Sequence, residues 1–188
     1  MSWSSRKPIV FRGEEYGQKD IEFRRIIDLS RRCGQIFELA VAGPRVPWDE
    51  IRNAGWRTVP GTDATKTVAR YNEFIAESRG EFSVAVNLEV KARTGWFSDR
   101  TAAYLAAGKP VIVQDTGFSE FLPCGRGLFA FQNADDVVAA VEEIQRDYAG
   151  HCEAAYEVAQ NFFAADKVLG DVLARCGLPH RNPTAASN

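Results

Sequence analysis

Apolar and polar positions alternate along this chain with two different periods. Short apolar runs, each followed by glycine, proline or polar residues, predict six strands, at residues 8–11, 36–43, 56–59, 82–86, 111–113 and 127–131. Between them apolar residues recur every three or four positions, which predicts helices at residues 20–33, 48–54, 65–78 and 98–107. Strands that alternate with helices predict an α/β fold: a doubly wound, mostly parallel six-stranded sheet with helices on both faces.

Residues 102–120 carry the clearest signal of this kind. An alanine-rich helix ends at Gly108, a tight Gly-Lys-Pro turn follows, and residues 111–113 form an entirely apolar strand. The strand runs into a polar segment that contains Gly117. In doubly wound sheets ligands bind where strands end. The segment therefore predicts both the fold and the edge of the sheet at which a ligand lies.

The last third of the chain is predicted to be helical. Helices are expected from residue 134, over residues 152–163 and over residues 166–176, and they are expected to close back across the sheet. The last helix carries one apolar stripe, formed by Val168, Leu169, Val172 and Leu173. We expect one domain at residues 1–177 and a polar, disordered tail at residues 178–188.

Composition narrows the class of protein. The chain has 188 residues, 45 % of them apolar and 11 % aromatic, which favours a globular protein. A net charge of −2 provides no general attraction for nucleic acid or an anionic membrane. The N-terminus lacks the apolar run of a signal peptide, and no run approaches the roughly 20 apolar residues of a membrane span. These features predict a cytoplasmic protein without a nucleic-acid partner or a membrane span.

Cysteine and histidine do not form a recognisable site. The four cysteines lie far apart, without a CxxC motif, and are expected to be mostly buried thiols in a reducing compartment. His151 and His180 stand alone, and neither is assigned a role. We predict no metal site.

The predicted helix start at Ser98 is a candidate phosphate site. Backbone amides at a helix N-terminus are unpaired and attract phosphate, and Arg100 can donate two hydrogen bonds to a diphosphate. Thr101 lies in the same first turn, whereas the carboxylate of Asp99 would repel a nearby phosphate. The alternative is an ordinary helix cap in which Ser98 accepts a backbone hydrogen bond.

The polar segment after the strand at 111–113 is a second candidate. Gly117 allows close approach of the backbone to a sugar or phosphate, and Glu120 can accept hydrogen bonds from sugar hydroxyls. Asp115 and Thr116 precede them. The alternative is a plain strand-to-helix turn capped by Asp115.

Two aromatic residues lie between the candidate sites. Trp96 and Phe97 are expected in a loop, where they can stack on a base or a sugar ring. They can equally fill the space between the sheet and another domain.

Residues 80–177 resemble the C-terminal, nucleotide-sugar-binding half of GT-B glycosyltransferases. The resemblance rests on the order of four features: Ala-Ala-Gly-Lys-Pro-Val at 106–111, Asp-Thr-Gly-Phe-Ser-Glu at 115–120, Gly-Arg-Gly-Leu at 125–128, and closing helices that end in Asn-Phe-Phe at 161–163. It implies a Rossmann-like fold, a nucleotide-diphosphate sugar as the donor substrate and no separate cofactor. If the chain is catalytic, the implied reaction is hexosyl transfer, in a cleft completed by an N-terminal partner domain or by a second copy. No catalytic residue is assigned.

The resemblance also implies a basic pair after the first strand. Arg12 and Lys19 are the residues in that place, and together they would contact the diphosphate. Glu14 and Glu15 lie between them, so a solvated loop is the alternative.

The sequence departs from the family at one motif. Many members hold the nucleotide sugar with two glutamates, and the corresponding positions here are Gly95 and Ala103. Some branches use a Ser/Arg arrangement there, as Ser98 and Arg100 would. Two other functions therefore stay open: a non-catalytic interaction module that docks through Trp96, Phe97 and Phe118, and a protein similar to nucleotide-sugar epimerases.

Overall fold

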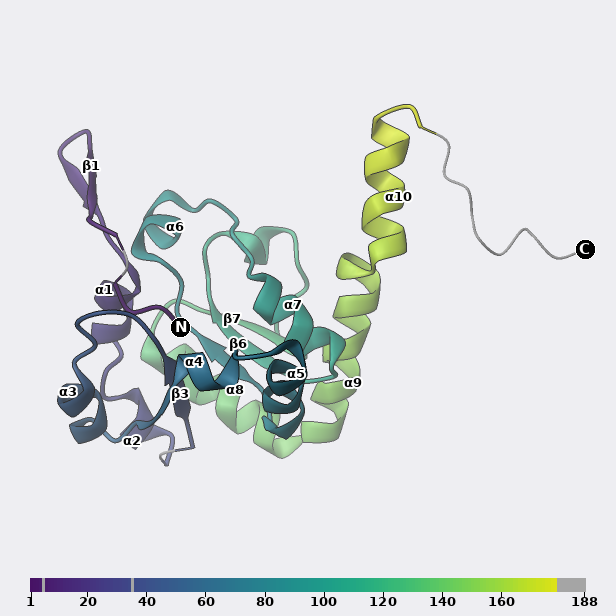
Figure 1. Cartoon of the computed structure of the whole chain (residues 1–188). Coiled ribbons are helices and arrows are strands. Elements are labelled where there is room, and N and C mark those ends of the chain that lie inside the picture. Colours follow the sequence, from purple (N-terminus) through teal and green to yellow (C-terminus); the bar gives the residue numbers. More distant parts are fainter. Residues whose placement is uncertain (5, 35, 179–188) are drawn as a thin grey trace, which may run out of the picture.

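The computed structural model describes residues 1–4, 6–34 and 36–178, and their strands form three groups (Figure 1). Strands β5 (Glu81–Ser83), β6 (Val111–Gln114) and β7 (Leu128–Phe131) make a parallel sheet in that order. Strands β3 (Glu38–Val41) and β4 (Arg57–Pro60) form a parallel pair, and β1 (Ile9–Phe11) and β2 (Glu14–Tyr16) an antiparallel hairpin. The parallel strands alternate with helices, which confirms the α/β class. Within the described residues the backbone hydrogen bonds show these three groups of strands and no six-stranded sheet.

Helices cover the three-stranded sheet on both faces. In chain order the helical segments of the described residues are α1 (Lys19–Arg24), α2 (Leu29–Arg32), α3 (Trp48–Asn53), α4 (Gly61–Ala64), α5 (Val68–Glu77), α6 (Asn87–Ala92), α7 (Asp99–Ala106), the 3-10 turn η1 (Phe118–Glu120), α8 (Ala134–Arg146), α9 (Tyr148–Val158), the π-helical turn η2 (Ala159–Phe163) and α10 (Ala165–Arg175). Successive residues of a strand point to opposite faces. Ile112 accordingly packs in the cluster that contains side chains of α1, α3 and α8, whereas Val111 and Val113 pack with α5, α7 and α9.

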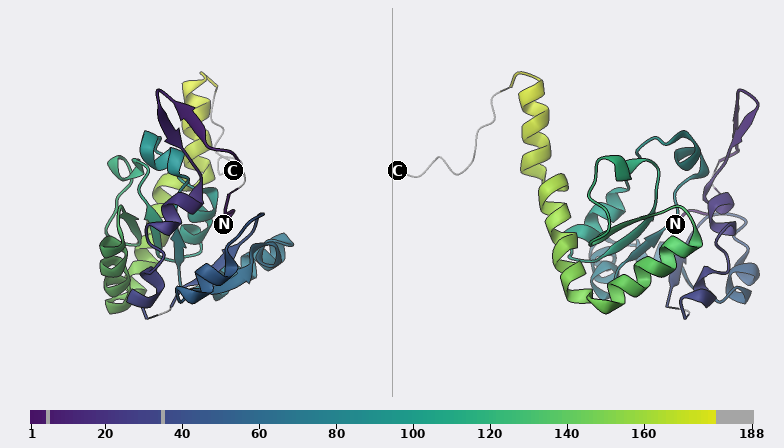
Figure 2. Two further views of the ribbon diagram at one scale, coloured as in Figure 1. Left: turned by 90° about the vertical axis from the view of Figure 1, so that its left-hand side faces the viewer. Right: turned by 180° about the vertical axis from the view of Figure 1, so that it is seen from behind.

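The first predicted strand exists, but it does not belong to the parallel sheet. Residues 9–11 pair with β2 through a turn at Arg12 and Gly13, both of which have positive φ. The hairpin projects from the domain (Figures 1 and 2), and the side chain of Val10 is 69 % exposed. An apolar run can pair with a parallel or with an antiparallel strand. Here a two-residue turn places β2 directly beside β1 as its antiparallel partner.

Residues 1–3 extend the β3–β4 pair instead. Ser2 forms a parallel bridge with Ala42, directly after β3, and the backbone N–H of Trp3 donates to the Ala42 carbonyl (3.0 Å). The side chain of Trp3 is buried against Phe23. The polar start of the chain therefore occupies the position beside β3, which the apolar pattern alone did not reveal.

Several predicted helices have different limits. The predicted helix at 20–33 is interrupted between α1 and α2, and helix α6 lies where no helix was predicted. The predicted helix at 65–78 starts only at Val68, whose side chain is exposed. The cysteines are also more open than expected, since Cys124 and Cys176 are exposed and the other two are half-buried.

Helix α10 does not close back over the sheet. It extends away from the domain (Figures 1 and 2) and contains no buried residue. The expected inner stripe is largely open, because Val168, Leu169 and Val172 are exposed. Helices α8 and α9 do pack on the sheet, as expected. Apart from Leu178, the predicted tail lies outside the described residues.

Candidate functional site

Arg100 is fixed by two side chains of β5. It lies in the first turn of α7, its Nε donates to Oε1 of Glu81 (2.5 Å), and its Nη2 donates to Oγ of Ser83 (2.6 Å). Burial lowers the pKa of Arg100, but the carboxylate of Glu81 more than compensates, so the pKa lies above its ordinary value. Arg100 is therefore a charged group with a fixed orientation.

Lys19 belongs to the same electrostatic environment. Burial and the charge of Arg100 lower the pKa of Lys19 from 10.5 to about 8, and Glu81 partly opposes this. Lys19 starts α1 and Arg100 lies in α7, so the fold brings together two of the predicted site residues that are far apart in the sequence. Two cations near one carboxylate leave an excess of positive charge.

Arg12, the other predicted member of the basic pair, lies elsewhere. It occupies the turn of the β1–β2 hairpin, where its guanidinium lies over the ring of Phe11, 5.2 Å from the ring centroid. The hairpin extends away from α7 (Figure 1). The structure therefore places Lys19 near Arg100, whereas Arg12 lies away from both.

A hollow of about 390 Å³ opens beside Arg100, between the first turns of two helices. Its lining consists of Thr65, Thr67, Val68, Tyr71, Asp99 and Arg100. Helices α5 and α7 both start there, so the positive ends of both helix dipoles lie at the hollow. The hollow thus combines a fixed guanidinium, hydroxyl groups and backbone amides.

The two helix starts differ in their capping. Oγ1 of Thr67 accepts the backbone N–H of Arg70 (3.1 Å) and caps α5. Ser98 makes no such bond, because its hydroxyl donates to Asp99 (3.3 Å), and Asp99 itself accepts the N–H of Arg100 (2.8 Å). The expected side-chain cap by Ser98 is therefore wrong, since Asp99 takes its place.

Two buried polar atoms behind this hollow have no hydrogen-bond partner within the described residues. They are Oε2 of Glu81 and Oγ1 of Thr101. Thr101 is fully buried and Glu81 is 7 % exposed. A buried polar atom without a partner is unfavourable, so these two atoms lower the stability of this region.

The segment after β6 folds around Asp115. This buried carboxylate accepts the N–H of Gly117 (2.9 Å) and the hydroxyl of Ser119 (2.9 Å). Gly117 has a φ of 101°, a conformation that L side chains rarely adopt. Arg93 lies 3.8 Å from Asp115 and donates to Glu120 (2.6 Å). Asp115 thus stabilises its own turn, while Glu120 remains on the surface.

Thr116 ties this turn to the loop before α7. Its Oγ1 donates to the carbonyl of Trp96 (2.6 Å), and its own carbonyl accepts the N–H of Gly95 (2.8 Å). The two aromatic residues of that loop diverge. Phe97 packs against Phe118 and Phe163, whereas Trp96 is 57 % exposed. Phe97 therefore fills space within this domain, and only Trp96 is free to stack on a ligand.

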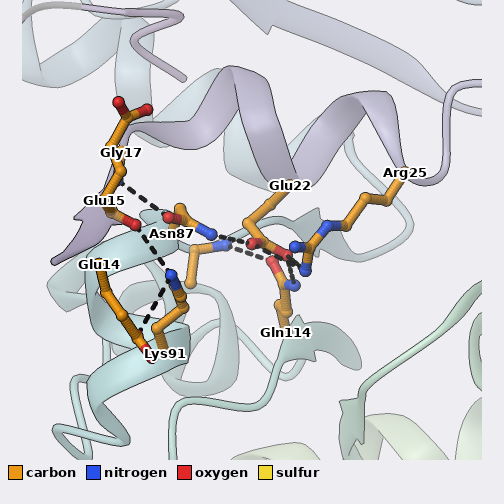
Figure 3. A network of polar contacts seen from close by, with 9 residues as sticks. Glu14, Glu15, Gly17, Glu22, Arg25, Asn87, Lys91 and Gln114 are labelled. Atoms are coloured by element: carbon orange, nitrogen blue, oxygen red, sulfur yellow. Dashed lines mark hydrogen bonds and ion pairs between the residues drawn. The ribbon is translucent and has the colours of Figure 1, made fainter. Parts of the chain in front are cut away.

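A buried network of amides and a carboxylate, absent from the sequence-based predictions, joins α1 to the start of α6 and the end of β6 (Figure 3). Glu22 accepts Nδ2 of Asn87 (2.6 Å), Nε2 of Gln114 (2.6 Å) and the guanidinium of Arg25 (3.2 Å). Oδ1 of Asn87 in turn accepts the N–H of Gly17 (2.9 Å), next to the hairpin. The signal in the sequence was weak: a glutamine that ends an apolar strand and a glutamate one turn before Ile26.

Fold and site together define an α/β protein with polar and cationic groups at the ends of its parallel strands. A model of the glycosyl transferase-like family matches residues 20–171. The chain belongs to this glycosyl transferase-like family, which confirms the resemblance inferred from the sequence. A search of curated proteins found no match.

Among residues 1–4, 6–34 and 36–178, no helix has the length and apolar character needed to cross a membrane. Within the same ranges, no three acidic, histidine or cysteine side chains gather in a way that would hold a metal ion.

Proposed function

We propose that this chain binds a nucleotide-diphosphate sugar, as the donor-binding half of a GT-B glycosyltransferase. The observation that carries the proposal is the hollow beside Arg100, where two helices begin. Lys19 does not line the hollow, but it is close enough to Arg100 for the charge of Arg100 to lower its pKa. Diphosphate carries negative charge that backbone amides, a guanidinium and an ammonium group all stabilise. Membership of the glycosyl transferase-like family supports the sugar part of the donor.

The hydrogen bonds of Arg100 support its role in this proposal. Nε and Nη2 are bound to Glu81 and Ser83, while Nη1 makes no hydrogen bond within the described part of the chain. The side chain is 29 % exposed, so this nitrogen can donate to a phosphate oxygen at the hollow. Asp99, which would repel phosphate, suits a hydroxyl of the ribose or the sugar. If the chain is catalytic, Arg100 and Lys19 would stabilise the leaving diphosphate.

We also propose that residues 1–3 lie between β3 and β5 in one six-stranded sheet of the order β4, β3, 1–3, β5, β6, β7. Burial, with nearby Arg100 and Lys19, lowers the pKa of the Met1 amine to about 5, while Glu81 at the start of β5 raises it. Met1 is thus close to β5, and Ser2 bridges to the end of β3. All of these strands would be parallel, and the order in which successive strands are added would reverse between residues 1–3 and β5. Doubly wound proteins bind ligands at such a point, outside the carboxyl ends of the strands.

The experiment is a thermal unfolding series of the full chain with UDP, GDP, dTDP and CMP, each with and without Mg²⁺. A nucleotide present at 100 times its Kd adds roughly 2.7 kcal/mol to the free energy of unfolding. We expect a rise in Tm for one base, and a roughly tenfold weaker Kd for Lys19→Ala because a charge-assisted hydrogen bond is lost. Lys7→Ala, which removes an exposed lysine, is the matched control.

No rise in Tm with any of these nucleotides would contradict the proposal. So would an equal loss of affinity in Lys19→Ala and Lys7→Ala, because binding would then depend on charge in general.

A further inference from the structure

Strand β1 of the projecting hairpin is entirely apolar and open to solvent. Ile9 is 57 % exposed, Val10 is 69 % exposed and Phe11 is 58 % exposed. Successive residues of a strand point to opposite faces, so these apolar side chains lie on both faces of the hairpin. A protein surface that docks on a hairpin covers one face or one edge, whereas lipid can surround both faces. The pattern therefore favours lipid as the partner of β1.

Strand β2 attaches the hairpin to the domain. Nζ of Lys91, in α6, donates to the carbonyl of Glu15 (2.9 Å) and lies 3.5 Å from the carboxylate of Glu14 (Figure 3). The same ammonium group lies 4.9 Å from the centroid of the Tyr16 ring. Because α6 holds β2, strand β1 is the one that faces away from α6. Its side chains are therefore free to meet a surface next to the projecting hairpin (Figures 1 and 2).

Cations flank the apolar run. Residues 6–12 read Arg-Lys-Pro-Ile-Val-Phe-Arg, which gives three cations and no acidic residue, and all seven are exposed. The guanidinium of Arg12 lies over the ring of Phe11, 5.2 Å from its centroid, so charge and ring face the solvent together. The acidic residues of the hairpin, Glu14 and Glu15, lie on β2, where Lys91 pairs with Glu14. The outer strand is therefore locally positive, although the whole chain has a net charge of −2.

We propose that residues 6–12 bind the surface of a bilayer that contains anionic phospholipid. The three apolar side chains of β1 enter the boundary between headgroups and acyl chains, and the three cations lie at the phosphate groups. Burial of apolar area and attraction to anionic lipid add to each other at a membrane surface, and neither requires a membrane-spanning helix. The proposal goes beyond donor binding, since the hairpin extends away from α7 and the hollow beside Arg100 (Figure 1).

The test is co-sedimentation of the full chain with vesicles of phosphatidylcholine that contain phosphatidylserine, and with vesicles of phosphatidylcholine alone. We expect strong binding to the first kind, weaker binding to the second, and a loss of the difference at high salt. Phe11→Ala is expected to lower the partition coefficient about tenfold, because a large apolar side chain no longer enters the lipid. Arg6→Gln is expected to lower it about fivefold on the anionic vesicles, because one cation is lost.

Tyr156→Ala is the matched control, because it removes an aromatic side chain that is 50 % exposed on α9, away from the hairpin (Figure 1). The proposal is overturned if the anionic vesicles do not bind the chain, if both kinds of vesicle bind it equally, or if Tyr156→Ala weakens binding as much as Phe11→Ala. Sedimentation velocity without vesicles tests the other occupant of β1. A dimer that Phe11→Ala dissociates would overturn the proposal, because a second copy would then cover this strand.

Discussion

Two groups of charged and polar side chains can be compared: the network around Glu22, and the cluster formed by Arg100, Glu81, Ser83 and Thr101. They differ in the number of buried polar atoms that have no hydrogen-bond partner. Asn87 and Gln114 each use their oxygen for a backbone N–H and their nitrogen for Glu22. At the cluster, one oxygen of Glu81 and the hydroxyl of Thr101 have no partner in the described residues. The amide groups of the network are therefore fully hydrogen-bonded within the protein, whereas the cluster contains two buried polar atoms that are not.

The largest effect is expected from Glu22→Gln. The amide oxygens of Asn87 and Gln114 are already bound to the N–H groups of Gly17 and Ala85, so their nitrogens must point at Glu22. An amide in place of the carboxylate would direct an NH₂ group toward another donor. We expect a loss of about 3 kcal/mol in the free energy of unfolding, measured by urea denaturation.

Glu50→Gln is the control for that change, because Glu50 accepts from Arg24 (2.8 Å) in an exposed pair. It is expected to lose less than about 1 kcal/mol. Equal losses of stability in the two variants would show that the Glu22 network contributes no more to the free energy of unfolding than an exposed ion pair.

The second effect concerns pH. The folded protein releases the Lys19 proton near pH 8, whereas an ordinary lysine holds it up to 10.5, so the unfolded chain binds more protons between these values. The stability contributed by Lys19 therefore rises with pH between about 8 and 10.5, by at most about 3 kcal/mol. The measurement is the difference in free energy of unfolding between the native chain and Lys19→Met from pH 7 to 10. A difference that does not change with pH would contradict the burial of Lys19 and its repulsion by Arg100, which together lower its pKa.

Thr101→Val tests the unused hydroxyl directly. Because Oγ1 of Thr101 has no partner in the described chain, its removal is expected to change the free energy of unfolding by less than about 1 kcal/mol, in the stabilising direction. Thr116→Val is the matched comparison, since it breaks the bond to Trp96 and is expected to lose about 1 kcal/mol. Chemical denaturation measures the free energy of unfolding of both variants. A clear loss of stability in Thr101→Val would show that the hydroxyl of Thr101 makes a hydrogen bond in solution.

The smallest effect is expected at the helix starts beside the hollow. Ser98→Ala removes a hydroxyl that caps nothing, so its free energy of unfolding is expected to stay within about 0.5 kcal/mol of the native value. Thr67→Ala removes the cap of α5 and is expected to lose about 1 kcal/mol. Thermal unfolding of the pair measures both, and the reverse ranking would show that Ser98 caps α7 in solution.

The sequence predicted the elements whose signal is local. The apolar run of β6 and the periodicity of α8 lie within short windows, and α8 begins with a capping box between Asn133 and Asp136. The β1–β2 hairpin was not predicted, because the residues of a strand do not reveal which strand it pairs with. The limit of the domain at residue 177 remains a prediction.

The site was predictable only in part, for a related reason. Arg100 followed from its place at a helix start, but its partner Glu81 lies 19 residues away, on a strand. The Glu22 network joins residues 65 and 92 positions apart, so no local pattern contains it. Lys19 was expected through the family resemblance, and the structure places it near Arg100 without Arg12.

Helix α10 has one consequence for how the domain unfolds. None of its residues is buried, and an isolated helix of this length is only marginally stable in water. Its amide protons should therefore exchange with solvent through local fraying, whereas those of α8, whose Val137 is fully buried, require opening of the core. The cooperative unit of the fold then ends near Phe163, and α10 melts as an independent appendage.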